Sequence, residues 1–168
     1  MKTIIFINGS PGSGKTTIGK LLKEKLNYPP YLELDWIREY HLDPTWKKKN
    51  KKEEKMSFEN LCFTVKNYIR NSYKNIILIG LTDKKIKGLL KNVKTKNYLI
   101  ITLFIDNDKE LKRRVITESR DSGYTNFNKA IKLNMKLKHR KLLKNEIKIN
   151  NTYNKPKKIL QEIVKLIK

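Results

Sequence analysis

Residues 3–22 constrain the fold most, because they combine three local patterns in a fixed order. Residues 3–7 (Thr-Ile-Ile-Phe-Ile) are β-branched or aromatic and predict a buried strand. Residues 9–16 (Gly-Ser-Pro-Gly-Ser-Gly-Lys-Thr) follow and satisfy the pattern G-x-x-x-x-G-K-[ST] without a mismatch. Apolar residues then recur at helical spacing, at positions 18, 21, 22 and 26. The sequence therefore predicts a strand, a glycine-rich turn and a helix in succession.

The composition of this turn suits a triphosphate. Glycines let the backbone come close to an anion and adopt positive φ, and the following helix directs its N-terminal amides at the same place. In this pattern Lys15 reaches the β- and γ-phosphates, and the hydroxyl of Thr16 binds Mg²⁺. We therefore expect ATP and Mg²⁺ as cofactors; the alternative is a glycine-rich turn without a ligand. The expected nucleotide-binding residues are Gly9, Ser10, Pro11, Gly12, Ser13, Gly14, Lys15, Thr16 and Thr17.

Length and composition favour one domain without a membrane segment. A chain of 168 residues is long enough for a substantial core. No apolar run approaches 18 residues, the length that a membrane span requires. The N-terminus shows no signal-peptide pattern, and Cys62 is the single cysteine, which excludes an internal disulfide. These features predict a cytoplasmic protein.

The chain is strongly basic, with 39 Lys and Arg against 16 Asp and Glu and a formal net charge of +23. Two explanations stay open, a surface for a polyanion such as nucleic acid and the codon bias of an AT-rich genome. Because Lys predominates, each Arg indicates a position where a planar, bidentate fork is useful. The arginines are Arg38, Arg70, Arg113, Arg114, Arg120 and Arg140.

Hydrophobic periodicity predicts alternating strands and helices. After the first unit, strands are expected at 31–35, 75–79, 98–105 and 147–149. Helices are expected at 14–26, from 36, from 57 with Ser57 as N-cap, at 83–93, 108–118 and 126–143, and from 156. Alternation of this kind predicts an α/β domain whose parallel sheet is covered on both faces. Ligands bind at the carboxyl ends of such strands, so the phosphate loop, Asp35, Gly80 and Asp106 should share one edge.

The assembled residues resemble the small P-loop kinases, which include gluconate and shikimate kinases, chloramphenicol phosphotransferase, polynucleotide 5′-kinases and nucleoside monophosphate kinases. The resemblance rests on the loop at 9–16 and on Asp35-x-x-Arg38, and it covers nearly the whole chain. It implies a three-layer P-loop NTPase fold with a five-stranded parallel sheet, formed by residues 1–168 as a single kinase domain.

The same resemblance implies roles for residues in the second half of the chain. Arg113, Arg114 and Arg120 look like the arginines of a mobile lid around 113–126, and the first two are expected to bind the nucleotide. Residues 150–152 (Asn-Asn-Thr) resemble the loop beside the adenine. A solvated helix face is the other interpretation of the arginine cluster.

One departure from the family pattern concerns the metal. Many relatives carry an acid at the end of strand 3, but here 78–83 (Leu-Ile-Gly-Leu-Thr-Asp) contains no acid before Asp83. Either Asp35 or Asp83 serves the Mg²⁺, or catalysis is weak. With Thr16, Asp35 is taken as the expected metal ligand.

The leading functional hypothesis is an ATP-dependent kinase that phosphorylates a hydroxyl of a small molecule or of a 5′-hydroxyl nucleic-acid end. Lys15, Asp35 and Arg120 are the expected catalytic residues, with Asp35 taking the acceptor proton. Asp35, Arg38 and Gly80 are expected to bind the acceptor. For Asp35 a helix N-cap is the alternative, and for Arg38 a surface salt bridge.

Two other functions remain open. A nucleoside monophosphate kinase would need more than one arginine on the acceptor side, where only Arg38 and Arg70 are available. An ATP-binding switch on nucleic acid would fit the charge, although no base-reading motif is present. We expect no membrane partner, and either a monomer or a homodimer.

Overall fold

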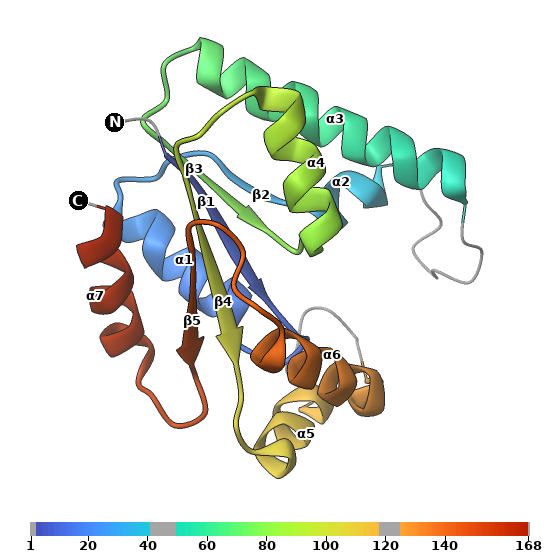
Figure 1. The fold of residues 1–168 in the computed structure, drawn as a ribbon, viewed down its shortest axis with the longest axis vertical. Coiled ribbons are helices and arrows are strands. Elements are labelled where there is room, and N and C mark those ends of the chain that lie inside the picture. Colours follow the sequence, from blue (N-terminus) through green and yellow to red (C-terminus); the bar gives the residue numbers. More distant parts are fainter. Residues whose placement is uncertain (1–2, 41–49, 118–124, 168) are drawn as a thin grey trace.

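A computed structural model of the chain describes residues 3–40, 50–117 and 125–167 as alternating strands and helices (Figure 1). The strands are β1 (Thr3–Gly9), β2 (Tyr31–Glu33), β3 (Asn75–Ile79), β4 (Tyr98–Phe104) and β5 (Glu146–Asn150). The helices are α1 (Lys15–Lys25), α2 (Leu34–Glu39), α3 (Lys51–Arg70), α4 (Asp83–Val93), α5 (Asp108–Ile116), α6 (Phe127–His139) and α7 (Pro156–Ile167).

The five strands of the described residues form one parallel sheet in the order β2-β3-β1-β4-β5. Ile7 of β1 is in register with Ile79 of β3 and with Ile101 of β4. Because all strands run the same way, their carboxyl ends lie at one edge, which is where the phosphate loop begins. The predicted five-stranded parallel sheet is confirmed.

Helices cover both faces of the sheet. Side chains alternate along β1, so Ile5 and Ile7 pack in the core beneath α1 and α7, whereas Ile4 and Phe6 pack in the core beneath α3 and α4. Figure 1 shows α1 beside α7 on one side of the sheet and α3 beside α4 on the other. A third small cluster, which includes Ile105, joins α5 to α6 beyond the end of β4. The predicted three-layer α/β architecture is confirmed.

Two predicted boundaries on the acceptor side were wrong. The helix expected from Ser57 begins at Lys51, because the side chain of Asn50 caps it by accepting hydrogen bonds from the amides of Lys52 and Glu53. Ser57 is buried inside this helix, and its hydroxyl donates to the carbonyl of Glu53 at 2.8 Å. Residues 51–55, which are all Lys or Glu, belong to this helix, and its dipole favours Glu53 and Glu54 in the first turn.

The second boundary is that between β2 and α2. The strand ends at Glu33 instead of 35, and α2 begins at Leu34 with Glu33 at the N-cap position. Asp35 therefore lies in the first turn of α2 and is not its N-cap, so that alternative for Asp35 is wrong.

A buried ion pair fastens β5 to β4 and to the turn after α6. The carboxylate of Glu146 accepts two hydrogen bonds from Arg140, both at 2.7 Å, and one from the hydroxyl of Thr102 at 2.5 Å. The amide of Leu143 also donates to it, at 2.6 Å. Burial alone would raise the pKa of Glu146, but these hydrogen bonds outweigh it and hold the pKa below its ordinary value.

We predict that Glu146→Gln lowers the free energy of unfolding at pH 7 by about 3 kcal/mol, because Arg140, only 14% exposed, loses one of its two carboxylate partners and keeps Asp83 alone. The ionised carboxylate stabilises the fold above the unfolded pKa of about 4.3, and this contribution is lost as pH falls through the lower folded pKa. Urea denaturation between pH 7 and pH 3 should therefore show a smaller loss of stability with acid in the variant. Glu59→Gln, at an exposed pair with Lys55, is the control. Equal urea midpoints for the two variants would contradict this assignment.

Candidate functional site

The phosphate loop leaves the carboxyl end of β1 through backbone conformations that favour glycine. Gly9, Gly12 and Gly14 have φ of +149°, +82° and +91°. A Cβ on Gly9 would lie 2.3 Å from the hydroxyl oxygen of Ser13, and a Cβ on Gly12 would lie 2.9 Å from Val115 of α5. The predicted glycines are thus required both by the turn and by the close approach of neighbouring atoms.

The phosphate loop brings buried hydroxyl groups and an ammonium group close together. Ser10 and Ser13 are fully buried, and their hydroxyl oxygens have no hydrogen-bond partner among the described residues. The Nζ atom of Lys15 donates to the carbonyl of Ser10 at 2.9 Å, which places this ammonium at the loop. The first turn of α1 contains no acid that would repel an anion. Buried hydroxyls, an ammonium and a helix N-terminus together form a site that fits the phosphates of ATP.

The loop before α7 contacts the phosphate loop, and the sequence did not predict this contact. The side-chain amide of Asn151 is buried and donates to the carbonyl of Ser13 at 2.8 Å. A Cβ on Gly14 would lie 2.6 Å from that same nitrogen. Residues 150–152, expected beside the adenine, therefore lie against the phosphate loop. The two partners are 138 positions apart, and no local pattern links them.

The arginines of the expected lid make contacts on and beside α5. Arg113 and Arg114 both donate to Glu110, at 2.7–2.8 Å, and these hydrogen bonds lower the pKa of its carboxyl to about 2. Arg114 also donates to the carbonyls of Asn151 and Thr152, at 2.9 and 2.6 Å. Arg120 lies outside the described residues, as does half of the expected lid, so the lid stays a prediction.

The expected acceptor residues lie together at the same edge of the sheet. A Cβ on Gly80, which follows β3, would lie 3.9 Å from the carboxylate of Asp35. Asp35 is 59% exposed and accepts a hydrogen bond from Arg38 at 3.0 Å. The other terminal nitrogen of Arg38 donates to Glu54 of α3 at 2.5 Å, and Glu54 also pairs with Lys85 of α4 at 3.4 Å. Sequence reasoning missed Glu54 and Lys85, which come from helices that only the fold brings together.

The two acids considered for the metal differ in their surroundings. Both oxygens of Asp83 contact Arg140, at 2.8 and 3.1 Å, and one also accepts from Asn8 at 3.2 Å. The carboxylate of Asp35 is more exposed and has one partner group in Arg38. Within the described ranges, no three His, Cys, Asp or Glu side chains gather as a metal site. Mg²⁺ does not require such a cluster, since it is often held by one or two protein oxygens together with phosphates and water.

Asp106, the remaining acid expected at this edge, lies on the β5 side. It pairs with Lys138 of α6, and it accepts a hydrogen bond from Asn150 at 2.5 Å. These contacts connect α6 to the end of β5 and do not direct Asp106 toward Asp35. It is therefore assigned a structural role.

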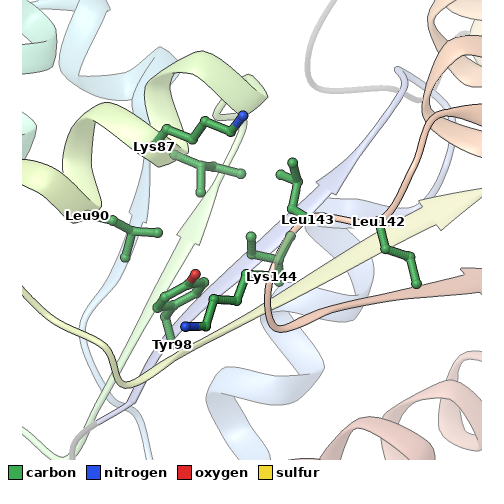
Figure 2. A pocket seen from close by; sticks show the side chains of 8 residues that line it. Lys87, Leu90, Tyr98, Leu142, Leu143 and Lys144 are labelled. Atoms are coloured by element: carbon green, nitrogen blue, oxygen red, sulfur yellow. The ribbon is translucent and has the colours of Figure 1, made fainter.

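A separate cavity of about 310 Å³ lies between α4, the turn before β5 and the start of β4 (Figure 2). Figure 2 shows Leu90, Tyr98 and Leu143 around it, with Lys87 and Lys144 beside them. Tyr98 is paired with Ile4, at the amino end of β1, so this cavity is remote from the phosphate loop. Its lining contains no Asp, Glu, His, Cys, Ser or Thr, and it is not the candidate site.

Three solved structures similar to this chain are kinases. A sugar kinase from Janibacter sp. HTCC2649 has a TM-score of 0.72 at 12% identity, over 98% of this chain and 93% of that one. A gluconokinase from Sinorhizobium meliloti 1021 has a TM-score of 0.69 at 12% identity, over 98% and 91%. A shikimate kinase from Bacteroides thetaiotaomicron has a TM-score of 0.64 at 18% identity, over 98% of both chains. These likenesses establish the fold.

The sequence itself supports a family assignment. No curated protein matches the chain. None of the helices in the described part is long and apolar enough to cross a membrane. A family model described as an AAA domain matches residues 5–132, from the middle of β1 into α6. The chain therefore belongs to this AAA domain family, and its fold is that of a small P-loop kinase.

Proposed function

We propose that the protein is an ATP-dependent phosphotransferase that moves the γ-phosphoryl group of ATP to a hydroxyl of its acceptor. The main support for the proposal is that two sites lie at the same edge of the sheet. One is a glycine loop whose buried Ser10 and Ser13 hydroxyls lack partners among the described residues, and the other is an exposed carboxylate, Asp35, beside Gly80. The kinase fold and the AAA domain family support it.

In the proposed reaction, the acceptor oxygen attacks the γ-phosphorus, the bond from that phosphorus to the β–γ bridging oxygen breaks, and ADP leaves. The carboxylate of Asp35 takes the acceptor proton, and Lys15 stabilises charge on the β- and γ-phosphates. Thr16 and Asp35 would hold Mg²⁺, which neutralises phosphate charge when bound. Arg113, Arg114 and Arg120 would complete this neutralisation from the lid.

A nucleoside monophosphate kinase is disfavoured by the position of its second candidate arginine. Arg70 is the last residue of α3, whereas the acceptor edge contacts Glu54 near the start of that helix. Sixteen residues of helix separate them, which corresponds to about 24 Å. Arg38 alone would then have to hold the acceptor phosphate.

An acceptor can be identified by incubating the protein with γ-labelled ATP and a panel of nucleosides, sugars, shikimate-like acids and 5′-hydroxyl oligonucleotides, and by measuring which compound becomes labelled. An ATP-binding switch on nucleic acid, which the net charge of +23 suggests, would hydrolyse or hold ATP without labelling any acceptor. Labelling of a hydroxyl compound supports the kinase proposal.

We predict that Lys15→Ala abolishes measurable transfer and weakens ATP binding while the thermal unfolding midpoint stays near that of the wild type. The reason is that Lys15 lies at the loop, where its charge would face the phosphates. Isothermal titration calorimetry with Mg·ATP measures the affinity. Lys20→Ala, an exposed lysine on the same helix, is the control and should behave as wild type. Unchanged affinity and turnover in Lys15→Ala would refute the nucleotide site.

We predict that Asp35→Asn lowers kcat by roughly 10²-fold or more while ATP affinity and melting stay near normal, because Asn keeps the shape of the side chain but accepts no proton. Turnover is measured on the best acceptor of the panel. Asp108→Asn removes an exposed acid from the first turn of α5, so it controls for loss of charge at a helix start. Turnover of Asp35→Asn within a few-fold of wild type would remove Asp35 from the mechanism.

A further inference from the structure

Acids gather at the acceptor edge of a chain in which they are scarce. The chain has 16 Asp and Glu against 39 Lys and Arg. Four of these acids nevertheless contact the cations of the acceptor edge and its flank, and they come from four separate parts of the sequence. They are Asp35, Glu54, Asp83 and Glu146.

Two of these acids share Arg38, the arginine that contacts the proposed catalytic carboxylate of Asp35. The guanidinium of Arg38 contacts Asp35 at 3.0 Å and Glu54 at 2.5 Å, and only 21% of its side chain is exposed. Glu54 also contacts Lys85, whose side chain is 26% exposed. Arg38, the cation expected to bind the acceptor, and its neighbour Lys85 are thus both bound to carboxylates of the protein.

The third cation of this region is held in the same way. Arg140 contacts Asp83 at 2.8 Å and Glu146 at 2.7 Å, and 14% of its side chain is exposed. Asp83 in turn accepts from Asn8, the residue before the phosphate loop. Glu146 is fully buried, so the partly exposed acids among these partners are Asp35, Glu54 and Asp83. Among the described residues they face Arg38, Lys85 and Arg140, and this group of six is formally neutral within a protein of +23.

We infer that the acceptor is a neutral hydroxyl compound, such as a polyol or a nucleoside, and that Glu54 sets this specificity. The inference rests on the proposed phosphotransferase function. An acid or a nucleic-acid end would have to displace a carboxylate of the protein from Arg38 or Lys85 before either cation could bind it. A neutral hydroxyl requires no such displacement, and the exposed carboxylate of Asp35 can accept its hydrogen bond.

The first test separates acceptors by charge without knowing their identity. A cell metabolite extract is passed over an anion-exchange resin, and the unbound and bound fractions are each offered to the protein with γ-labelled ATP. We expect at least about tenfold more label transferred in the unbound, neutral fraction. Label mainly in the bound, anionic fraction would overturn the inference but support the phosphotransferase. No label in either fraction would overturn the phosphotransferase itself, and with it this inference.

The second test uses acceptor pairs that differ by one anionic group, sorbitol with gluconate and thymidine with thymidine 3′-monophosphate. Glu54→Gln keeps the size of the side chain and removes the charge that holds Arg38 and Lys85. The ratio of kcat/KM for the neutral over the anionic member should fall about tenfold or more in this variant. Glu59→Gln, the same substitution on the same helix, should leave the ratio unchanged. An unchanged ratio in Glu54→Gln, or an equal loss on both members, would show that Glu54 does not set specificity.

Discussion

The proposed site depends first on the glycine backbone of the phosphate loop, which only residues without a Cβ can form. Gly9 joins β1 to the loop where a Cβ would contact Ser13, and Asn151 holds the loop through the Ser13 carbonyl. Because the sheet is parallel, this turn lies at the same edge as α2 and Gly80. The phosphate loop, the loop that contains Asn151 and the carboxylate of Asp35 therefore lie at the same edge of the sheet, although they are far apart in the sequence.

Charge at this edge is compensated locally although the whole chain is strongly basic. Glu54 draws Arg38 of α2 and Lys85 of α4 to α3, and Arg140 binds acids from α4 and β5. These pairs hold the side chains in fixed orientations, which a phosphoryl-transfer site requires. They also give Arg38, Lys85 and Arg140 carboxylate partners although the whole chain carries a net charge of +23.

Most of the fold was predictable, because periodicity is a local property. The bounds of α4 were predicted correctly, and α6 was correctly assigned as a helix despite alternating apolar residues over 131–137. Errors arose at element ends: Asn50 caps α3, which begins at Lys51 instead of 57, α2 begins directly after β2, and α6 ends at His139 instead of 143. The motif indicated the loop, Asp35 and Arg38, but no pattern could reveal Glu54, Asn151 or the Arg140 pairs. These contacts depend on residues 16, 138 and 57 positions apart that only the tertiary fold brings together.

Transfer of phosphate from ATP to a hydroxyl at this edge of the sheet can be followed by ³¹P nuclear magnetic resonance. Mg·ATP is incubated with the protein and the neutral metabolite fraction, and the phosphorus resonances are followed with time. The γ-phosphate signal of ATP should decay while a new phosphomonoester signal and ADP grow together. Decay into inorganic phosphate alone, or an unchanged ATP spectrum, would contradict phosphoryl transfer to an acceptor.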